Sequence, residues 1–239
     1  MITATHLTKK FGKLYALNDV SLDLRDGQTI SLIGPNGSGK TTFIKTLLGL
    51  VIPDSGTIAF EGADIRGNSE YRNHIGYMPQ ISRFPDNIRI AQLFDMVRDI
   101  RKTHNTEDHD LIATFGLDKM RDKALRTLSG GTRQKVSACL AFLFNPPVII
   151  LDEPTAGLDP LAAEQLKEKI RSEKEKGKLI LITSHILSDL DDITSEIVYL
   201  QEGVLQFHKT IGQLRNDTGE EKLARAIAHV MKMNPENAA

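Results

Sequence analysis

The sequence predicts an α/β protein: a mostly parallel sheet with flanking helices, antiparallel strands near the N-terminus, and a helical subdomain. Segments 2–7 and 19–24 alternate apolar and polar residues, as half-buried antiparallel strands do. Segments 148–151 and 179–182 are near-continuous apolar runs, which favour parallel strands buried on both faces and connected by helices. From about 88 to 144 helical periodicity dominates and the pattern indicates no strong strand.

The elements of the first part of the chain follow from apolar patterning and turn residues. Segment 28–33 is predicted to be a strand that leads into a glycine-rich turn and then a helix, which continues to about Leu50. Residues 53–56, with the sequence Pro-Asp-Ser-Gly, are typical of a turn. Segment 57–60 is therefore predicted to be a further short strand.

The later elements have clear boundaries. A helix between the two apolar runs is predicted to begin at Pro160 with Asp159 as its N-cap, and to end before Gly177. Segments 197–200 and 204–207 are predicted to form a hairpin. A final helix is indicated by an apolar stripe of Leu223, Ile227 and Val230. The stripe leaves open whether this helix packs on its own domain or on a partner.

Composition excludes several classes of protein. The 239 residues carry 30 Lys and Arg against 31 Asp and Glu, a net charge of −1, whereas dedicated nucleic-acid binders show a basic excess. The single cysteine, Cys139, excludes an intrachain disulfide and any Cys-rich zinc or copper cage. The first residues lack the pattern of a secretory signal, and no apolar stretch is long enough to cross a bilayer. We expect a soluble intracellular chain.

A phosphate-binding loop follows the strand predicted at 28–33. The motif G-x-x-x-x-G-K-[ST] is matched by Gly34, Pro35, Asn36, Gly37, Ser38, Gly39, Lys40 and Thr41. Glycines let the backbone wrap closely around phosphate oxygens, and the next helix points its positive end at the same anion. Lys40 is expected to reach the β- and γ-phosphates, and the Thr41 hydroxyl to ligate Mg²⁺. A chance glycine-rich turn is disfavoured by the strand–loop–helix context.

Two acidic residues directly follow the apolar run at 148–151. In proteins with such a phosphate loop the aspartate after this strand lies beside the metal, so we expect Asp152 to hold Mg²⁺ or its water shell. Glu153 is the candidate general base or orienting acceptor for the water that attacks the γ-phosphate. Acids that serve only as turn residues or N-caps are the alternative, and the nearby phosphate loop disfavours it.

Segment 128–134, with the sequence Leu-Ser-Gly-Gly-Thr-Arg-Gln, precedes another predicted helix. Its hydroxyl, its unencumbered backbone N–H groups and the helix dipole make a second anion-binding element. Taken alone, Ser129 is more simply an N-cap in a tight turn. The two interpretations are compatible, and one chain with two phosphate-binding elements requires an explanation.

In their order along the chain, these motifs resemble those of the ATP-binding cassette (ABC) family of transporter ATPases, up to about Phe207. The matching features are Phe11 as the adenine-stacking aromatic, 34–42 with Thr42 as Walker A, Gln80 in the Q-loop phrase 77–80, 128–134 as the signature, 148–153 as Walker B, 156–159 as the D-loop, and His185 as the switch histidine. Thr132 stands where many members have glutamine, so the role of that side chain is in doubt.

The resemblance implies a head-to-tail dimer that binds two ATP molecules between its subunits. Each ATP, with Mg²⁺ held partly through water by Thr41, Gln80 and Asp152, would lie under the partner's Ser129, Gly130, Gly131 and Asp159. His185 would hold the γ-phosphate and the attacking water, together with Glu153. The alternatives are a core aromatic for Phe11, a satisfied strand-end histidine for His185, and an N-cap for Asp159, which we expect in any case.

The resemblance also implies one ABC ATPase domain over residues 1–239. Its parts are a core at about 1–87 and 145–210, a helical subdomain at 88–144 and a C-terminal helical extension at 211–239. Such a chain drives a separate transmembrane permease, through which it reaches a possible periplasmic partner. It lies in the cytoplasm, on the inner face of the membrane, and binds no nucleic acid. A non-transport ATP-gated switch and a scaffold are the alternatives.

Several phrases resemble more narrowly the ATPase subunit of the Nos-type transporter, which serves copper-site maturation of nitrous-oxide reductase. These phrases lie at 76–80, 83–85, 129–136 and 183–188. No residue pattern indicates copper chemistry in this chain, since Cys139 falls in an apolar helix and the six Met residues are scattered. Copper or sulfur handling would then belong to partner subunits, and an ATPase for another export substrate is the alternative.

Overall fold

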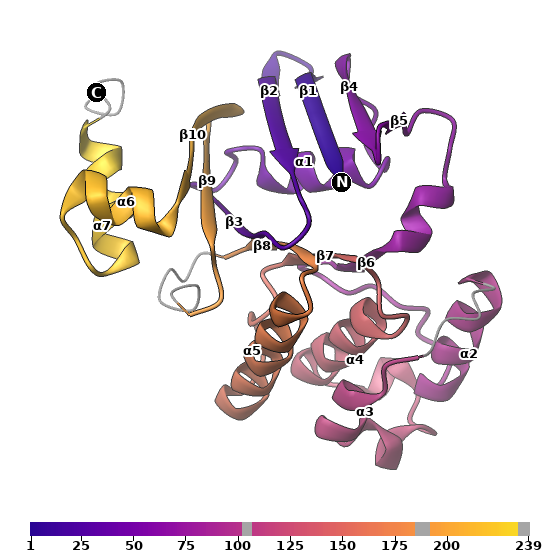
Figure 1. Cartoon of the computed structure of the whole chain (residues 1–239). Helices are drawn as coiled ribbons and strands as arrows, with labels where there is room; N and C mark the ends of the chain where they lie inside the picture. Colours follow the sequence, from indigo (N-terminus) through magenta and orange to yellow (C-terminus); the bar gives the residue numbers. More distant parts are fainter. Residues whose placement is uncertain (102–106, 185–191, 234–239) are drawn as a thin grey trace.

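The computed structural model describes residues 1–101, 107–184 and 192–233, and these confirm the predicted α/β fold (Figure 1). The strands of an antiparallel sheet are β1 (Ile2–Phe11), β2 (Leu14–Leu24), β4 (Ser55–Phe60) and β5 (Ala63–Asp64), in the order β2-β1-β4-β5. The strands of a mixed sheet are β3 (Thr29–Ile33), β6 (Ile75–Met78), β7 (Val148–Asp152), β8 (Leu179–Thr183), β9 (Glu196–Gln201) and β10 (Val204–Thr210). Their order is β10-β9-β3-β8-β7-β6, parallel except for the predicted hairpin of β9 and β10.

Helices cover both faces of the mixed sheet. The helices are α1 (Lys40–Leu47), α2 (Ile90–Arg101), α3 (Asp110–Thr114), α4 (Gly130–Phe142), α5 (Pro160–Glu175), α6 (Ile211–Thr218) and α7 (Leu223–Met233). Short 3₁₀ turns lie at Glu70–His74, Leu117–Met120 and Leu125–Thr127. Figure 1 shows α1 between the two sheets and α2 to α5 beyond the opposite face of the mixed sheet. We call α2, α3, α4 and the turns between them the helical region.

The position of β7 between two hydrophobic cores explains why its sequence is continuously apolar. Val148 and Ile150 pack into a hydrophobic core that also contains α1 and the antiparallel sheet. Ile149 and Leu151 point the other way, into a core shared with α5 and the helical region. Because successive side chains of a strand point to opposite faces, burial of both faces requires an apolar residue at every position.

The helix predicted to reach Leu50 is shorter than expected, and its end has a local cause. Helix α1 ends at Leu47, and Gly49 adopts a left-handed φ of 63°. The N–H of Leu50 then donates to the carbonyl of Lys45 at 2.8 Å, and the N–H of Gly49 to that of Thr46 at 3.0 Å. This glycine-terminated bonding pattern satisfies carbonyls that the helix would otherwise leave unpaired.

The boundaries predicted for α5 are confirmed, and the open question about the last helix is answered. Asp159 caps α5, with Pro160 as the first helical residue and Gly177 beyond the end at a φ of 76°. In α7, Leu223 and Ile227 are buried in a hydrophobic core of this chain. The same core contains residues of the mixed sheet. The last helix therefore packs on its own domain.

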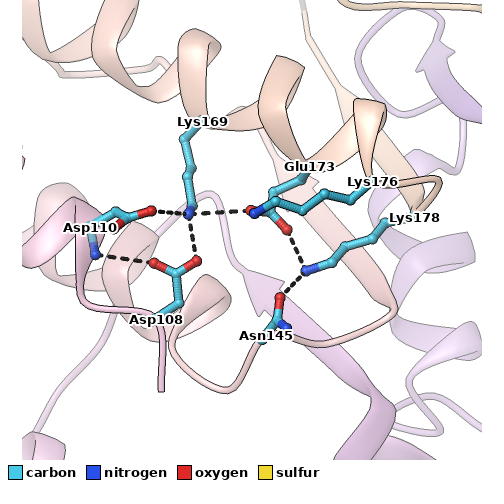
Figure 2. Close-up of polar contacts among 7 residues, drawn as sticks. All are labelled: Asp108, Asp110, Asn145, Lys169, Glu173, Lys176 and Lys178. Atoms are coloured by element: carbon cyan, nitrogen blue, oxygen red, sulfur yellow. Dashed lines mark hydrogen bonds and ion pairs between the residues drawn. The ribbon is translucent and has the colours of Figure 1, made fainter. Parts of the chain in front are cut away.

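A partly buried cluster of charges joins α5 to the helical region (Figure 2). Lys169 of α5 donates hydrogen bonds to Asp108 and, at 2.9 Å, to Asp110, both at the entry to α3. One turn further along α5, Glu173 lies 3.2 Å from the same ammonium and pairs with Lys176 and Lys178. Lys178 also donates to Asn145, in the loop before β7. The cluster therefore fixes the position of α5, the helix that Asp159 caps.

Glu173 is the most completely buried acid of this cluster. Burial raises the pKa of its carboxyl, but hydrogen bonds from Lys176 and Lys178 outweigh burial and hold the pKa at about 2, below the ordinary 4.5. Because the folded-state pKa is depressed, the carboxylate stabilises the fold above about pH 4.5. That contribution is lost as the pH falls from 4.5 through about 2.

We therefore expect Glu173→Gln to lower the free energy of unfolding at pH 7 by about 1–3 kcal/mol. The difference from wild type should shrink as the pH falls from 4.5 towards 2. Urea unfolding followed by circular dichroism across this pH range measures both quantities. Glu168→Gln, an exposed position of the same helix, is the control. A difference between wild type and Glu173→Gln that does not change with pH would contradict the assignment.

Candidate nucleotide-binding site

One cavity of about 350 Å³ gathers predicted site residues from distant parts of the sequence. Its lining includes Phe11 from β1, Gln80 after β6 and Glu153 after β7, together with residues 36–42 at the start of α1. Leu14 and Ala16 of β2 complete the wall. The cavity therefore lies at the carboxyl ends of β3, β6 and β7, which is where open α/β sheets bind ligands.

The loop that leads from β3 to α1 is confined by neighbouring backbone. Gly39, with a φ of 105°, leaves so little space that a Cβ atom would lie 2.3 Å from the carbonyl oxygen of Ala16. At Gly34, with a φ of 151°, a Cβ would lie 2.0 Å from the carbonyl oxygen of Leu200. Both positions therefore require glycine, for conformation and for space. The loop is held between β2 and β9 before any ligand binds.

Lys40 reaches back over this loop. Its ammonium donates to the carbonyls of Gly34 at 2.7 Å and Pro35 at 2.9 Å. Burial lowers the pKa of Lys40, while the negative charges of Glu153 and Asp152 act to raise it. A cation inside a loop at a helix N-terminus is an arrangement that binds phosphate.

Asp152 ends β7 with a carboxylate that is only 3% exposed. One oxygen accepts from the Thr183 hydroxyl at 2.5 Å, and the other lies 3.4 Å from the Thr41 hydroxyl. Burial raises the pKa of this carboxyl, against the opposing hydrogen bond from Thr183. Carboxylate and hydroxyl oxygens side by side are the donors that Mg²⁺ prefers, so Thr41 and Asp152 fit such an ion.

Glu153 has a strained backbone. Its φ is 52°, in the left-handed region that side-chain-bearing residues rarely occupy, at a cost of about 1–2 kcal/mol. Its N–H donates to the Thr183 carbonyl at 3.1 Å and lies 3.0 Å from the Thr183 hydroxyl. The turn aims the residue at the cavity wall. Strain of this kind concentrates at functional sites, which supports a role for the carboxylate.

Thr183 is a residue of the site that sequence reasoning missed. Its hydroxyl contacts both acids, since it donates to Asp152 and accepts from the N–H of Glu153. The register of β7 and β8 pairs Asp152 directly with Thr183. A hydroxyl residue at the end of a second buried apolar run was the available signal. Its use required knowledge that the two runs are adjacent strands.

Phe11 lies at the mouth of the cavity. Its side chain is 53% exposed, which excludes the alternative of a core aromatic. The Lys9 ammonium lies 5.5 Å from the centre of the ring. An exposed ring beside a phosphate loop offers a flat apolar surface to a base.

The second predicted anion site lies apart from this cavity. Ser129 caps α4, where its hydroxyl accepts from the N–H of Thr132 at 3.2 Å and lies 2.9 Å from the Thr132 hydroxyl. The N-cap interpretation is therefore confirmed. Ser129 and Gly130 are exposed and do not line the cavity of their own chain. Gly131 packs so closely on Gly157 that a Cβ would lie 2.8 Å from its carbonyl oxygen.

Asp159 uses both carboxylate oxygens within its own chain. One accepts from the N–H of Ala162 at 2.9 Å, which confirms the predicted N-cap, and the other pairs with Lys135 of α4 at 2.7 Å. These hydrogen bonds lower the pKa of the carboxyl. His185, the remaining predicted site residue, lies outside the described residues.

The described parts of the chain offer neither a clustered metal site nor a membrane-spanning helix. They contain no group of three or more His, Cys, Asp or Glu side chains placed to hold a metal ion. Across 1–101, 107–184 and 192–233, every helix is too short or too polar for a membrane span.

Comparisons with known proteins agree on one family. The sequence profile described as ABC transporter matches residues 17–156. The Nod factor export ATP-binding protein I of Ralstonia nicotianae is 31% identical over 85% of this chain and 65% of its own length. An uncharacterised ABC transporter ATP-binding protein of Synechocystis is 35% identical over 87% and 61%. The chain thus spans a little under two thirds of these relatives.

Other relatives match over nearly their whole length. The lipopolysaccharide export system ATP-binding protein LptB of Haemophilus influenzae is 32% identical over 91% of this chain and 93% of its own. A solved ATP-binding subunit of an ABC transporter superposes with a TM-score of 0.89 at 28% identity, over 97% and 99% of the two chains. The cassette MJ0796, solved as a dimer bound to ADP and Pi, has the same fold, with a TM-score of 0.77 at 22% identity over 88% and 99%.

The close approach at Gly39 leads to a prediction about the loop. We expect Gly39→Ala to weaken nucleotide binding at least 10-fold and to lower the melting temperature, because the new methyl group must displace the Ala16 carbonyl. Gly37→Ala is the matched control, since its φ is 80° but a Cβ there meets nothing within 4 Å. Gly37→Ala should lower the free energy of unfolding by only the backbone strain of about 1–2 kcal/mol. Equal losses in the two variants, measured by titration with a fluorescent nucleotide and by calorimetry, would contradict this.

Proposed function

This chain belongs to the ABC transporter family, and on that premise we propose that it binds and hydrolyses ATP to drive a separate membrane permease. The observation that carries the proposal is the convergence of the phosphate loop, Gln80 and Glu153 on one cavity. Hydrolysis needs a phosphate clamp, a metal-binding carboxylate and an acceptor for the attacking water. Lys40, Asp152 and Glu153 are placed to supply these.

Each side chain then has a distinct task. The exposed ring of Phe11 stacks on adenine, and residues 34–42 hold the phosphates with their backbone N–H groups. Lys40 leaves the carbonyls of its own loop to contact the β- and γ-phosphates. Glu153, aimed by its strained turn, accepts a proton from the water or orients it. His185 is proposed as a further contact to the γ-phosphate and the water, from the resemblance of its phrase alone.

Thr41, Asp152 and Gln80 are the proposed Mg²⁺ ligands, directly or through water. When bound, Mg²⁺ neutralises charge that develops on the phosphate oxygens. Thr183 assists by holding Asp152 in position and by opposing the rise that burial causes in the pKa of this carboxyl, since its hydroxyl donates to the carboxylate at 2.5 Å. The same hydroxyl lies against the N–H of Glu153, so one threonine orients both acids.

We further propose that two copies of the chain close head to tail around two ATP molecules. Ser129, Gly130 and Gly131 form a helix N-terminus that lies outside the cavity of their own chain, with Ser129 and Gly130 exposed and Gly131 half-buried. A partner's nucleotide is the anion that such a surface fits. Asp159, which both caps α5 and pairs with α4, lies at the same exposed junction. The dimeric state of the similar cassette MJ0796 supports this arrangement.

The permease is proposed to dock beside the Q-loop. Ile81, which directly follows Gln80, is 69% exposed, and Met96 and Ile100 of α2 are exposed as well. Apolar side chains in water are typical of surfaces that bind another protein. With its permease, the chain would lie on the cytoplasmic face of the membrane. A periplasmic partner would then be reached through the permease.

The substrate is the least constrained part of the proposal. The phrases at 76–80, 83–85, 129–136 and 183–188 favour a transporter that serves copper-site maturation of nitrous-oxide reductase, in which other subunits handle the metal. Relatives named for Nod factor and lipopolysaccharide export favour a second candidate, an exporter of another substrate.

The role of Glu153 is tested by Glu153→Gln. We expect ATP affinity to stay within about two-fold of wild type, hydrolysis to fall at least 100-fold, and an ATP-bound dimer to accumulate, because the water loses its acceptor. Phosphate release and size-exclusion chromatography with ATP measure these effects. Lys40→Ala is the contrast, since it should weaken nucleotide binding itself. Hydrolysis by Glu153→Gln at the wild-type rate would remove this carboxylate from the mechanism.

The partner and the substrate are tested by purifying the tagged chain from detergent-solubilised native membranes. We expect a membrane subunit to copurify, encoded beside this gene and close to a nitrous-oxide reductase gene. Deletion of this gene should then yield a reductase that lacks copper. A reductase with full copper content after deletion would favour the other export substrate, and recovery of the chain without any membrane subunit would contradict the transport proposal.

A further inference from the structure

One buried side chain connects the nucleotide cavity to the start of α4 at residues 129–131, which belong to the signature motif 128–134 and are called the signature segment from here on. Gln134 of α4 is 8% exposed, and its amide nitrogen donates to the main-chain carbonyl of Gln80 at 3.0 Å. Its amide oxygen accepts from the Ser82 hydroxyl at 2.9 Å. Gln80 also lines the cavity. A single side-chain amide therefore connects the Q-loop, at the wall of the cavity, to the helix that begins at Gly130.

Neighbouring contacts of α4 do not duplicate this link. Arg133 lies 3.6 Å from Asp86, but the Asp86 side chain is 73% exposed, and ion pairs so open to water contribute little. Lys135 pairs with Asp159, at the start of α5 rather than in the Q-loop. Gln134 is only 8% exposed and its hydrogen bond to the Gln80 carbonyl is partly buried, so loss of this donor should cost more than loss of an exposed ion pair.

The chemistry of the link requires an amide. The Gln80 carbonyl needs a donor and the Ser82 hydroxyl needs an acceptor, and a glutamine side chain supplies both at once. Glutamate of the same size keeps the acceptor but sets a carboxylate oxygen against the Gln80 carbonyl. Leucine supplies neither group. The two substitutions therefore separate loss of the donor from loss of both bonds.

We infer that Gln134 is a positioning residue that ties the signature segment to Gln80, so that the state of one cavity sets the orientation of the surface offered to the partner's nucleotide. The inference rests on the proposed function. A shift of Gln80 moves its own carbonyl, and the hydrogen bond from Gln134 passes the shift to α4. Gly130 begins the same helix, roughly 6 Å away along its axis, so Gly130 and Gln134 move together as parts of one rigid helix.

The expected signature is a split between binding and turnover. In Gln134→Leu and Gln134→Glu the affinity of the single chain for ATP should stay within about two-fold of wild type, because the side-chain hydrogen bonds of Gln134 in the described structure go to Gln80 and Ser82 and not to the phosphate loop. The kcat for hydrolysis should fall about 10-fold. In a Glu153→Gln background, the protein concentration needed for the ATP-bound dimer should rise by a similar factor.

Two control variants sharpen the experiment. Ser82→Ala removes one partner of Gln134 but keeps the bond to Gln80, and should lose at most two-fold in kcat. Gln92→Leu is the matched glutamine control, because Gln92 lies in the same helical region and accepts only from the Arg89 N–H in the described structure. It should match wild type in kcat and in dimer formation. Circular dichroism and the stoichiometry of nucleotide binding give the folded fraction of each variant.

The outcomes separate the inference from the proposed function. Wild type without ATP hydrolysis would contradict the function itself. An active wild type with unchanged kcat and dimerisation in both Gln134 variants would overturn the inference. So would a kcat loss in Ser82→Ala as large as in Gln134→Leu, or parallel losses of ATP affinity and kcat. Should Gln134→Leu fail to fold, the near-isosteric Gln134→Glu decides by the same measurements.

Discussion

The register of the parallel strands is the constraint on which the site depends. Thr183, the last residue of β8, pairs with Leu32 of β3 on one side and with Asp152 of β7 on the other. The phosphate loop that follows β3 and the acids that end β7 are thereby brought to the same edge. A shift of β7 by one residue would turn Asp152 to the opposite face of the sheet and into one of its hydrophobic cores. Core packing on both faces opposes such a shift.

The two cores give the two faces of the sheet different tasks. On one face, α1 and the antiparallel sheet bring Phe11 and the wall at Ala16 to the phosphate loop. On the other, α4 and α5 carry the junction of Ser129, Gly131 and Asp159, of which Ser129 and Asp159 are exposed. The charge cluster around Lys169 fixes α5 against the helical region. Rigid elements thus set both halves of the proposed chemistry, and short loops connect them.

Much of this could be predicted from sequence, because the relevant patterns are local. A phosphate loop needs glycines at set intervals, and a doubly buried strand needs an unbroken apolar run, so both can be seen within about ten residues. Thr183 and Gln134 could not be assigned in this way. Their roles depend on strand order and on one buried amide, which join residues 31 and 54 positions apart. The end of α1 was misjudged because Gly49 outweighs the apolar residues beyond it.

The two anion-binding elements differ in the charge that accompanies them. The phosphate loop contributes a buried lysine, and the adjacent end of β7 contributes a buried aspartate. Burial shifts the pKa values of these two groups in opposite directions, towards the neutral form of each. The signature segment offers only a hydroxyl and backbone N–H groups, while the nearby cations Arg133 and Lys135 are paired with Asp86 and Asp159. Neutral donors at a helix N-terminus complement an anion that is already held but bind it weakly alone. On the proposed function, the cavity therefore captures the nucleotide, and the signature segment recognises it only after capture.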